Sequence, residues 1–190
     1  MTKALEFRMS EAARAKALAE VRERIRSVPD FPSPGILFRD ITPVLQDART
    51  MQLALDLHLD AVADLAGKID RIVGVESRGF LFGMPLAHAL GVGFVPARKP
   101  GKLPGATITQ VYALEYGEGT LHMHVDAIAP GDRVLLVDDL LATGGTAGAA
   151  AQLVQRLGGE VVASLFLIEL AFLKGRERLA PLRVEALLAY

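Results

Sequence analysis

The sequence predicts an α/β fold in which a mostly parallel sheet is flanked by helices. Short apolar runs of strand length occur at residues 71–75, 92–97, 133–137 and 160–170, and the stretches between several of them carry apolar residues at helical spacing. Strands that alternate with helices form parallel sheets, because each helix returns the chain to the edge where the next strand starts. The 190 residues, 51% hydrophobic and 23% charged, suit a single domain spanning 1–190.

Composition excludes several classes of function. The formal net charge of −1 argues against a general nucleic-acid binder, which would carry a basic excess. The chain has no cysteine, so it has no disulfide, catalytic thiol or thiolate metal site. The N-terminus lacks the apolar core of a signal peptide, and the most apolar stretch, Val161–Leu173, is interrupted by Ser164 and Glu169. We expect a cytoplasmic protein that binds neither nucleic acid nor membranes.

The first third of the chain predicts two helices separated by an irregular segment. The first helix covers Ser10–Arg26, and the prolines and glycine of residues 29–35 then break the helical period before a short apolar run at 36–38. The second helix covers about Asp47–Ala66, with Gly67 at its C-terminal end. The residues expected to face inward are Leu18, Val21 and Ile25 in the first helix and Met51, Leu55, Val62 and Leu65 in the second.

The next segment predicts a β-α-β unit. Arg71–Val75 is an apolar run of strand length, Gly79–Leu90 has helical character, Gly91 ends that helix, and Val92–Ala97 is a second strand. Two strands joined by a helix in this way are parallel, with a right-handed crossover.

The rest of the chain predicts a hairpin followed by a second strand-helix-strand unit. Residues 107–115 and 120–125 are extended segments joined by a glycine-containing turn. Arg133–Val137 then reads as a buried strand, Thr146–Leu157 as a helix and Glu160–Leu170 as a further strand.

Three loops follow predicted parallel strands and carry unusual polar residues. They span Glu76–Gly79, Arg98–Lys102 and Asp138–Thr146. Ligands of open parallel sheets bind at the carboxyl ends of the strands, so we expect these loops to converge at one edge. The segment from Glu76 to Lys102 carries a net charge of +3 in a chain whose total is −1. This edge therefore predicts a site for a phosphate-bearing ligand.

The third loop has the features of a sugar-phosphate site. Thr143-Gly144-Gly145-Thr146 opens a predicted helix, where free backbone N–H groups and the helix dipole favour an anion such as phosphate. The loop lacks the Gly-Lys-Ser/Thr of a P-loop and the Gly-x-Gly-x-x-Gly of a dinucleotide site. Asp138 and Asp139 precede it, and two carboxylates suit the hydroxyls of a sugar as hydrogen-bond acceptors. Phosphate beside sugar hydroxyls indicates a sugar 5′-phosphate.

These residues resemble a known family. VLLVDDLLATGGT, residues 134–146, is similar to the phosphoribosyl-diphosphate motif of the type I phosphoribosyltransferases. Other segments resemble the members of that family that act on adenine: FPSPGILFRDITPVL from Phe31, GVESRGFLFG from Gly74, RKPGKLPG from Arg98, LEYG from Leu114 and LKGRERL from Leu173. The similarity covers roughly Val28–Leu188. It implies the type I phosphoribosyltransferase fold, with a small N-terminal hood over about residues 28–45.

The resemblance implies how the phosphoribosyl donor, 5-phospho-α-D-ribose 1-diphosphate, is bound. Its 5′-phosphate would lie on the loop residues Ala142, Thr143, Gly144, Gly145 and Thr146, and its diphosphate on Ser77, Arg78, Arg98, Lys99 and Lys102. Asp138 and Asp139 would accept hydrogen bonds from the ribose hydroxyls and stabilise positive charge at C1′ as diphosphate departs. Arg98 and Lys99 are adjacent in an extended chain, so we expect one of them to reach the site of a neighbouring subunit.

The resemblance also implies a site for the base. Main-chain groups of Leu37 and Arg39 in the hood would hydrogen-bond the purine edge, and Phe38 and Leu140 would sandwich its ring. Glu115 would close over the site and donate a proton to the purine N7 or hold the base in its reactive tautomer.

The implied reaction is a step of purine salvage in which adenine and the donor give AMP and diphosphate. Mg²⁺ would be its metal cofactor, held mainly by substrate oxygens and water, so we expect no direct protein ligand to the metal. The resemblance further implies a homodimer.

Two other functions carry weaker support. The donor motif alone allows a 6-oxopurine as the base, but the hood and LEYG segments favour adenine. A non-enzymatic regulator that senses the donor and binds nucleic acid would need a further domain or a basic face, and neither the length nor the net charge provides one.

The histidines have simpler interpretations. His122 and His124 share one side of a predicted strand and could form a metal pair, but no third ligand is apparent, so a solvated strand face is the favoured interpretation. His58 and His88 fall within predicted helices, where we expect surface or packing positions.

Overall fold

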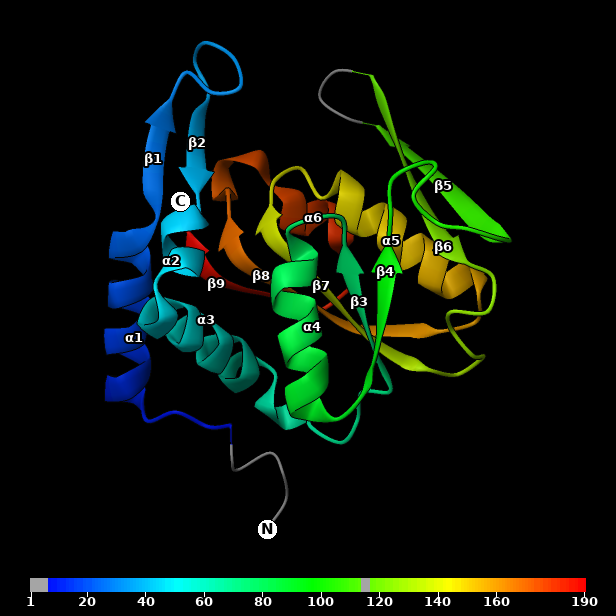
Figure 1. The fold of residues 1–190 in the computed structure, drawn as a ribbon, viewed down its shortest axis with the longest axis horizontal. Helices are drawn as coiled ribbons and strands as arrows, with labels where there is room; N and C mark the ends of the chain where they lie inside the picture. Colours follow the sequence, from blue (N-terminus) through cyan, green and yellow to red (C-terminus); the bar gives the residue numbers. More distant parts are fainter. Residues whose placement is uncertain (1–6, 114–116) are drawn as a thin grey trace. The chain divides into compact units, whose positions relative to one another are not determined.

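The computed structural model describes residues 7–113 and 117–190 (Figure 1). The chain divides into two structural units, residues 1–63 and 64–190, which are described separately below. The single domain over 1–190 remains a prediction. None of the helices in the described part of the chain is long and apolar enough to cross a lipid bilayer.

The first unit contains the two predicted helices, and each begins at a side-chain cap. α1 spans Glu11–Arg24, with the Ser10 hydroxyl accepting a hydrogen bond from Ala13 N at 3.2 Å. α3 spans Ala48–Ala61, with the Asp47 carboxylate accepting from Thr50 N at 2.8 Å. Each cap satisfies one of the N–H groups that have no partner in the first helical turn. A short helix, α2 (Thr42–Gln46), precedes α3, and a 3-10 turn, η2 (Ala63–Leu65), follows it.

The predicted inward face of the second helix was only partly correct: Val62 is fully buried, but it lies just beyond the end of the helix. Met51 and Leu55 are only half-buried, and α3 ends at Ala61 rather than at Ala66. The buried face carries polar as well as apolar side chains: Thr50, Ala54, Leu57, His58 and Asp60. Asp60 is buried because its carboxylate accepts from Met9 N at 2.9 Å and from Arg14 Nε at 3.1 Å. The spacing of apolar residues does not predict a buried face that contains polar side chains, because those side chains are buried only when another segment supplies their hydrogen bonds.

The segment predicted to be irregular forms the loop of an antiparallel hairpin that the sequence did not predict. β1 (Arg26–Pro29) pairs with β2 (Leu37–Asp40) in the register Arg26↔Asp40 to Pro29↔Leu37, and the two strands form a separate ribbon (Figure 1). Pro29 is tolerated because it ends a strand of a two-stranded ribbon, where a missing backbone donor costs little. The rings of Phe31 and Phe38 pack edge to face at 5.1 Å. The hood region is therefore an ordered ribbon.

The second unit is built on a five-stranded parallel sheet, as predicted. The strand order is β4-β3-β7-β8-β9. Its strands are β3 (Arg71–Val75), β4 (Gly93–Ala97), β7 (Arg133–Leu141), β8 (Glu160–Glu169) and β9 (Val184–Ala189). The remaining elements are α4 (Gly79–Leu90), an antiparallel ribbon of β5 (Thr107–Ala113) and β6 (Glu118–His124), α5 (Gly145–Arg156), η3 (Ala171–Leu173) and α6 (Gly175–Leu179).

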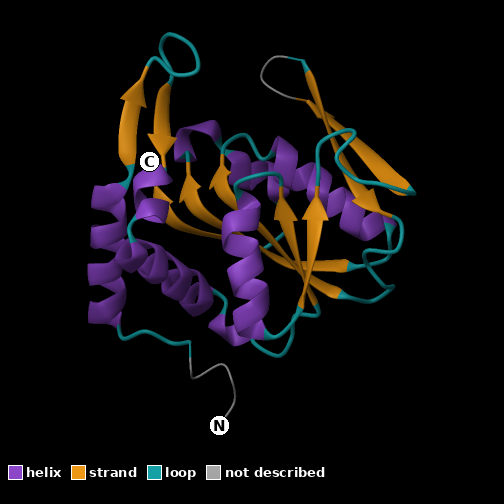
Figure 2. Ribbon diagram, in the orientation of Figure 1, coloured by secondary structure: helices purple, strands orange, loops and turns teal. Residues whose placement is uncertain are grey.

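The β-α-β unit, the hairpin and the second strand-helix-strand unit are confirmed, with two differences. β7 continues to Leu141 instead of ending at Val137, because Leu140 and Leu141 pair with Ile168 and Glu169 of β8. β9 was not predicted; it pairs with β8 at the end of the sheet. Figure 2 shows α4 and α5 on opposite faces of this sheet, and α5 packs with the β5-β6 ribbon in one continuous apolar core.

His58 is a fully buried histidine in the core of the first unit. Its Nδ1 donates to the Ala54 carbonyl oxygen at 2.6 Å, and burial lowers its pKa to about 4. The folded protein therefore keeps this ring neutral at a pH where the unfolded chain protonates it. The expectation that His58 is a packing residue is confirmed, whereas His88 is exposed on α4.

We predict that His58 destabilises the protein as pH falls. The unfolded chain gains a proton on His58 below about pH 6.5, and the native state does so only near its lowered pKa, so stability is lost between these values. From pH 7 to pH 4.5 the wild type should lose about 2.5 kcal/mol more unfolding free energy than the His58→Gln variant. Urea unfolding at both pH values measures this. His88→Gln is the matched control and should keep the wild-type slope; an unchanged slope in His58→Gln would refute the prediction.

Candidate active site

Three loops meet at the carboxyl edge of the sheet, as predicted. β4, β3 and β7 are neighbouring parallel strands, so the residues that follow them lie side by side. After β3, the Glu76 carboxylate accepts from Arg98 Nε and Nη2, both at 3.2 Å, and from Lys99 N at 2.8 Å. Arg78 Nε lies 3.1 Å from Asp139 Oδ2 on β7. Ion pairs thus join the loop after β3 to the loop after β4 and to the end of β7.

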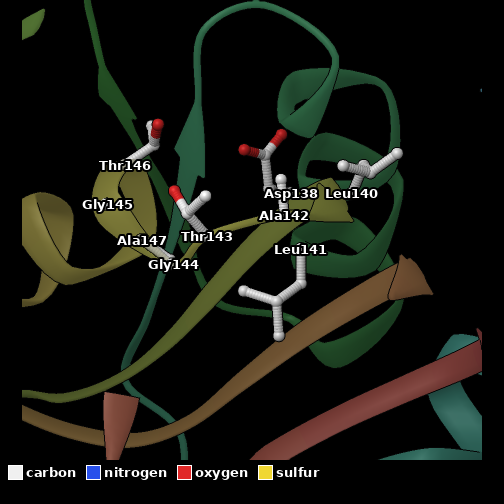
Figure 3. Close-up of a pocket in the computed structure, with 9 residues that line it drawn as sticks. All are labelled: Asp138, Leu140, Leu141, Ala142, Thr143, Gly144, Gly145, Thr146 and Ala147. Atoms are coloured by element: carbon white, nitrogen blue, oxygen red, sulfur yellow. The ribbon is translucent and has the colours of Figure 1, made fainter. Parts of the chain in front are cut away.

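A cavity of about 70 Å³ lies between the end of β7 and the start of α5 (Figure 3). Its lining comprises Asp138, Leu140, Leu141 and the loop residues from Ala142 to Ala147. The carboxylate of Asp138 and the hydroxyls of Thr143 and Thr146 lie on the same side of the loop (Figure 3). All five residues predicted to hold a phosphate are among those that line this cavity.

The N-terminus of α5 is open to an anion. Its N-cap, Gly144, has a left-handed backbone (φ 78°) and no side chain that could cap the helix. In the described part of the chain no side chain caps this end, so the first N–H groups of α5 lack the partner that Ser10 gives α1 and Asp47 gives α3. Residues of this first turn line the cavity. A helix end of this kind binds phosphate through backbone N–H groups and the helix dipole.

The loop is held from behind by the start of α6. A methyl group on Gly175 would lie 2.2 Å from the Ala142 carbonyl oxygen, and one on Gly144 would lie 2.6 Å from the Gly175 carbonyl oxygen. Two backbones therefore touch here with no room for a side chain on either. α6 is anchored by Leu179, which is buried with Leu141, Ala147, Phe166 and Val184. Sequence analysis found this segment only as part of the family resemblance and gave Gly175 no role.

The two adjacent carboxylates have different surroundings. Because β7 continues through them, their side chains point to opposite faces of the sheet. Asp138 is half-buried and lines the cavity, whereas Asp139 is 2% exposed and lies against Arg78. Asp139 N donates to Asp138 Oδ1 at 2.9 Å.

Burial also sets the ionisation of this pair. Desolvation, together with the negative charge of Asp139, raises the pKa of Asp138 well above its ordinary value. Desolvation likewise raises the pKa of Asp139, and the Arg78 guanidinium opposes that rise. A cationic group that enters the cavity would favour the ionised form of Asp138, so the pair is suited to stabilising positive charge.

The predicted diphosphate residues lie on the loops after β3 and β4. Arg98 is held by Glu76, donates to the Lys102 carbonyl oxygen at 3.0 Å and lies over the Phe80 ring at 5.9 Å. Ser77, Lys99 and Lys102 are exposed, and Arg78 is half-buried beside Asp139. The predicted cations are therefore of two kinds: two arginines held by carboxylates and two exposed lysines.

The predicted base-binding residues fall in three places. Leu37, Phe38 and Arg39 form the start of β2 in the first unit, where Leu37 is 48% exposed and Arg39 donates to the Ser27 hydroxyl. Leu140 lines the cavity of the second unit. Glu115 lies outside the described residues.

Within residues 7–113 and 117–190, no three histidine, aspartate or glutamate side chains are grouped so that they could hold a metal ion. His122 and His124 are half-buried rather than solvated on β6. The Nδ1 of His122 lies within 3.4 Å of the hydroxyls of Thr107 and Thr109, and its backbone pairs with Arg98. The favoured interpretation as a solvated face was therefore too simple, since these side chains pack on the ribbon.

Comparison with known proteins is consistent with this geometry. Residues 44–182 match the phosphoribosyl transferase domain family. The chain is 56% identical over 170 residues to the adenine phosphoribosyltransferase of Anaeromyxobacter dehalogenans strain 2CP-1, covering 90% of this chain and 98% of that protein. Its fold is similar to the crystal structure of the adenine phosphoribosyltransferase from Thermoanaerobacter pseudethanolicus, with a TM-score of 0.87, 52% identity and coverage of 91% and 99% of the two chains. The Saccharomyces cerevisiae enzyme, solved in complex with adenine and an imino-altritol bisphosphate, is similar with a TM-score of 0.85, 45% identity and coverage of 91% and 99%.

We predict that Gly175→Ala displaces the loop at the start of α5. Its methyl group would overlap the Ala142 carbonyl oxygen, so backbone must move, at a cost of about 1–3 kcal/mol in stability. Affinity for inorganic phosphate, measured by calorimetry, should fall about tenfold because the N–H groups lose their alignment.

Gly148→Ala is the matched control for this prediction. Its methyl group would meet only Leu179 Cδ2, at an ordinary 3.8 Å, and alanine favours the helix interior by up to about 1 kcal/mol. This variant should bind phosphate as the wild type does and melt no lower. Wild-type phosphate affinity in Gly175→Ala would contradict the proposed role of the backbone contact.

Proposed function

The chain belongs to the adenine phosphoribosyltransferase family, and from that premise we propose how its residues carry out the transfer. The enzyme transfers the 5-phosphoribosyl group of 5-phospho-α-D-ribose 1-diphosphate to adenine, giving AMP and diphosphate, a purine-salvage reaction. The observation that best supports this assignment of residues is the cavity at the open N-terminus of α5 with the Asp138 carboxylate beside it.

The 5′-phosphate of the donor binds the loop from Ala142 to Thr146. Backbone N–H groups at the start of α5 and the hydroxyls of Thr143 and Thr146 are the donors available there. The tight contact between Gly144 and Gly175 fixes the loop before the ligand arrives. Binding therefore orders little additional protein, which keeps its entropic cost low.

Asp138 and Asp139 act on the ribose. Asp138 lines the cavity and accepts hydrogen bonds from a ribose hydroxyl; Asp139 becomes available to the second hydroxyl when Arg78 turns toward diphosphate. As the C1′–oxygen bond to diphosphate breaks, positive charge develops on the ribose ring. Fixed carboxylates in a site shielded from water stabilise that charge.

The leaving diphosphate is bound by the loops after β3 and β4. Arg78 presents a planar, forked donor suited to paired phosphate oxygens, and Ser77 adds a hydroxyl from the same loop. Lys102 is exposed on the second loop and closes over the diphosphate, while Arg98 and Lys99 add positive charge.

Magnesium is the metal that best fits these residues. A donor that carries diphosphate requires a metal-assisted reaction, and Asp138 supplies hard oxygen atoms at the edge of the cavity. We expect Mg²⁺ to be held mainly by donor oxygens and water, because the described residues contain no group of three potential ligands. When bound, it neutralises charge on the leaving group.

Adenine is the acceptor base of the proposed reaction. Main-chain groups of Leu37 and Arg39 read the amino-purine edge, while Phe38 and Leu140 hold its ring. Glu115 protonates N7 or holds the reactive tautomer as N9 attacks C1′.

The enzyme works as a cytoplasmic homodimer in which Arg98 or Lys99 reaches the neighbouring subunit's site. The two residues are adjacent in the chain, and Arg98 is held by its own Glu76 whereas Lys99 is exposed. A sedimentation mass of one chain at micromolar concentration would contradict the dimer.

The reaction is tested by supplying Mg²⁺, the phosphoribosyl donor and a panel of purine bases. We expect AMP from adenine, with little product from hypoxanthine, xanthine or guanine. Preferential formation of IMP or XMP would show that a 6-oxopurine is the substrate.

We predict that Asp139→Ala lowers kcat far more than it raises KM for the donor. The carboxylate acts on charge that develops in the transition state, so its loss should reduce kcat by about 10²–10³-fold. Steady-state kinetics on adenine measures both constants. A wild-type kcat with only a raised KM would refute the electrostatic role, and Asp64→Ala, a remote carboxylate paired with Arg183, is the matched control.

A further inference from the structure

Arg178, on the short helix α6, lies beside the phosphate loop. A methyl group built on Gly145, the first residue of α5, would lie 3.7 Å from Arg178 Nη1, and one on Gly144 would lie 3.4 Å from Arg178 Cβ. The Cα–Cβ direction in a helix tilts toward the N-terminus. The guanidinium therefore lies beside the first turn of α5, on the side where the methyl group on Gly145 would also meet the Ala113 carbonyl oxygen of β5 at 2.9 Å.

Arg178 differs from the neighbouring arginines in having no carboxylate partner within residues 7–113 and 117–190. Arg176, two residues earlier, is bound by Glu169 at 2.7 Å, and Arg183 is bound by Asp64 at 2.6 Å. Among the residues that the structure describes, Arg178 makes no hydrogen bond or ion pair, and its side chain is exposed. It is thus a cation that can turn to an incoming ligand without breaking an existing interaction.

The position of this charge is unfavourable in the empty protein. The N-terminus of a helix carries partial positive charge, so a cation beside it is repelled by the dipole and by the exposed N–H groups. A bound phosphate reverses the sign of that interaction. The Arg178 charge thus destabilises the protein without ligand and stabilises it when a phosphate is bound, which indicates a role in binding rather than in folding.

We propose that Arg178 is a binding residue for the 5′-phosphate of the donor, acting from α6 over the first turn of α5. This inference rests on the proposed function, since it concerns the same phosphate subsite. Gly175 brings α6 against the loop, and Arg178 follows it by three residues, about one helical turn later. The same short helix therefore fixes the loop through its first residue and supplies a cation through its fourth.

The proposal assigns Arg178 to the 5′-phosphate of the donor and not to its diphosphate. Arg178 borders Gly144 and Gly145, on the 5′-phosphate side of the donor site. The diphosphate cations belong to the loops after β3 and β4. Loss of Arg178 should weaken ligands that carry the 5′-phosphate and leave inorganic diphosphate unaffected.

The test compares Arg178→Gln with the wild type. Calorimetry with ribose 5-phosphate should give about fivefold weaker binding in the variant, and calorimetry with inorganic diphosphate should give the wild-type affinity. KM for the phosphoribosyl donor should rise by a similar factor with kcat and KM for adenine nearly unchanged, because the 5′-phosphate is remote from the reacting bond. The ligand-free variant should melt at a slightly higher temperature than the wild type, and Arg178→Lys should restore much of the binding.

Arg156→Gln is the matched control, because it removes the same charge from the last turn of α5. This variant should bind ribose 5-phosphate as the wild type does. The proposal is overturned if Arg178→Gln keeps wild-type affinity for ribose 5-phosphate, if both variants weaken equally, or if ligand-free Arg178→Gln melts lower. If the wild type forms no AMP while its binding of ribose 5-phosphate still depends on Arg178, the proposed function fails and this inference stands.

Discussion

Parallel pairing of β3 with β4 on one side and β7 on the other is the constraint on which the site depends. The register places Val75 opposite Ala97 and Gly74 opposite Val137, so β3 and β4 end at the same level and β7 continues past them to Leu141. Their backbone groups are satisfied by one another inside the sheet, and the interior residues are almost fully buried. Sliding any strand by one residue would turn its buried side chains to the other face. The core therefore fixes the height at which Glu76, Arg98 and Asp138 leave the sheet.

Charge at this edge is balanced locally. The segment from Glu76 to Lys102 carries +3, and such a concentration of cations would repel itself in a site without ligand. Glu76 holds Arg98 and Asp139 holds Arg78, so two of the cations are neutralised and oriented in the empty protein. Under the proposed function, an arriving diphosphate would replace these carboxylates with its own oxygens instead of ordering free side chains. The net charge of −1 therefore does not argue against a small phosphorylated ligand, because it conceals a local excess of cations at this edge.

Sequence patterns predicted the parts of the fold that depend on local signals. The runs from Arg71 to Ala97 gave the β-α-β unit, and Gly91 ended α4 with a left-handed backbone (φ 69°), as its glycine predicts. The features that were not predicted depend on contacts with other segments of the chain. Asp60 is buried because Met9 and Arg14 satisfy it, and β1 forms because β2 pairs with it. No hydrophobic period in the sequence indicates either partner, so the buried polar face of α3 and the β1-β2 hairpin were not predicted.

Much of the site is made of backbone, and this limits what a list of side chains can predict. A methyl group on Gly79 would lie 2.5 Å from the Val137 carbonyl oxygen, as close a fit as that between Gly175 and Ala142. α4 and α6 therefore touch the end of β7 through glycines, one on each side of the carboxylate pair and the phosphate loop. These contacts position backbone N–H groups, which every residue type except proline possesses. What the contacts require is therefore the absence of a side chain at the glycine. The sequence alone does not show which glycines have no room for a side chain. The packed structure shows that a methyl group would clash at Gly175 and would fit at Gly148.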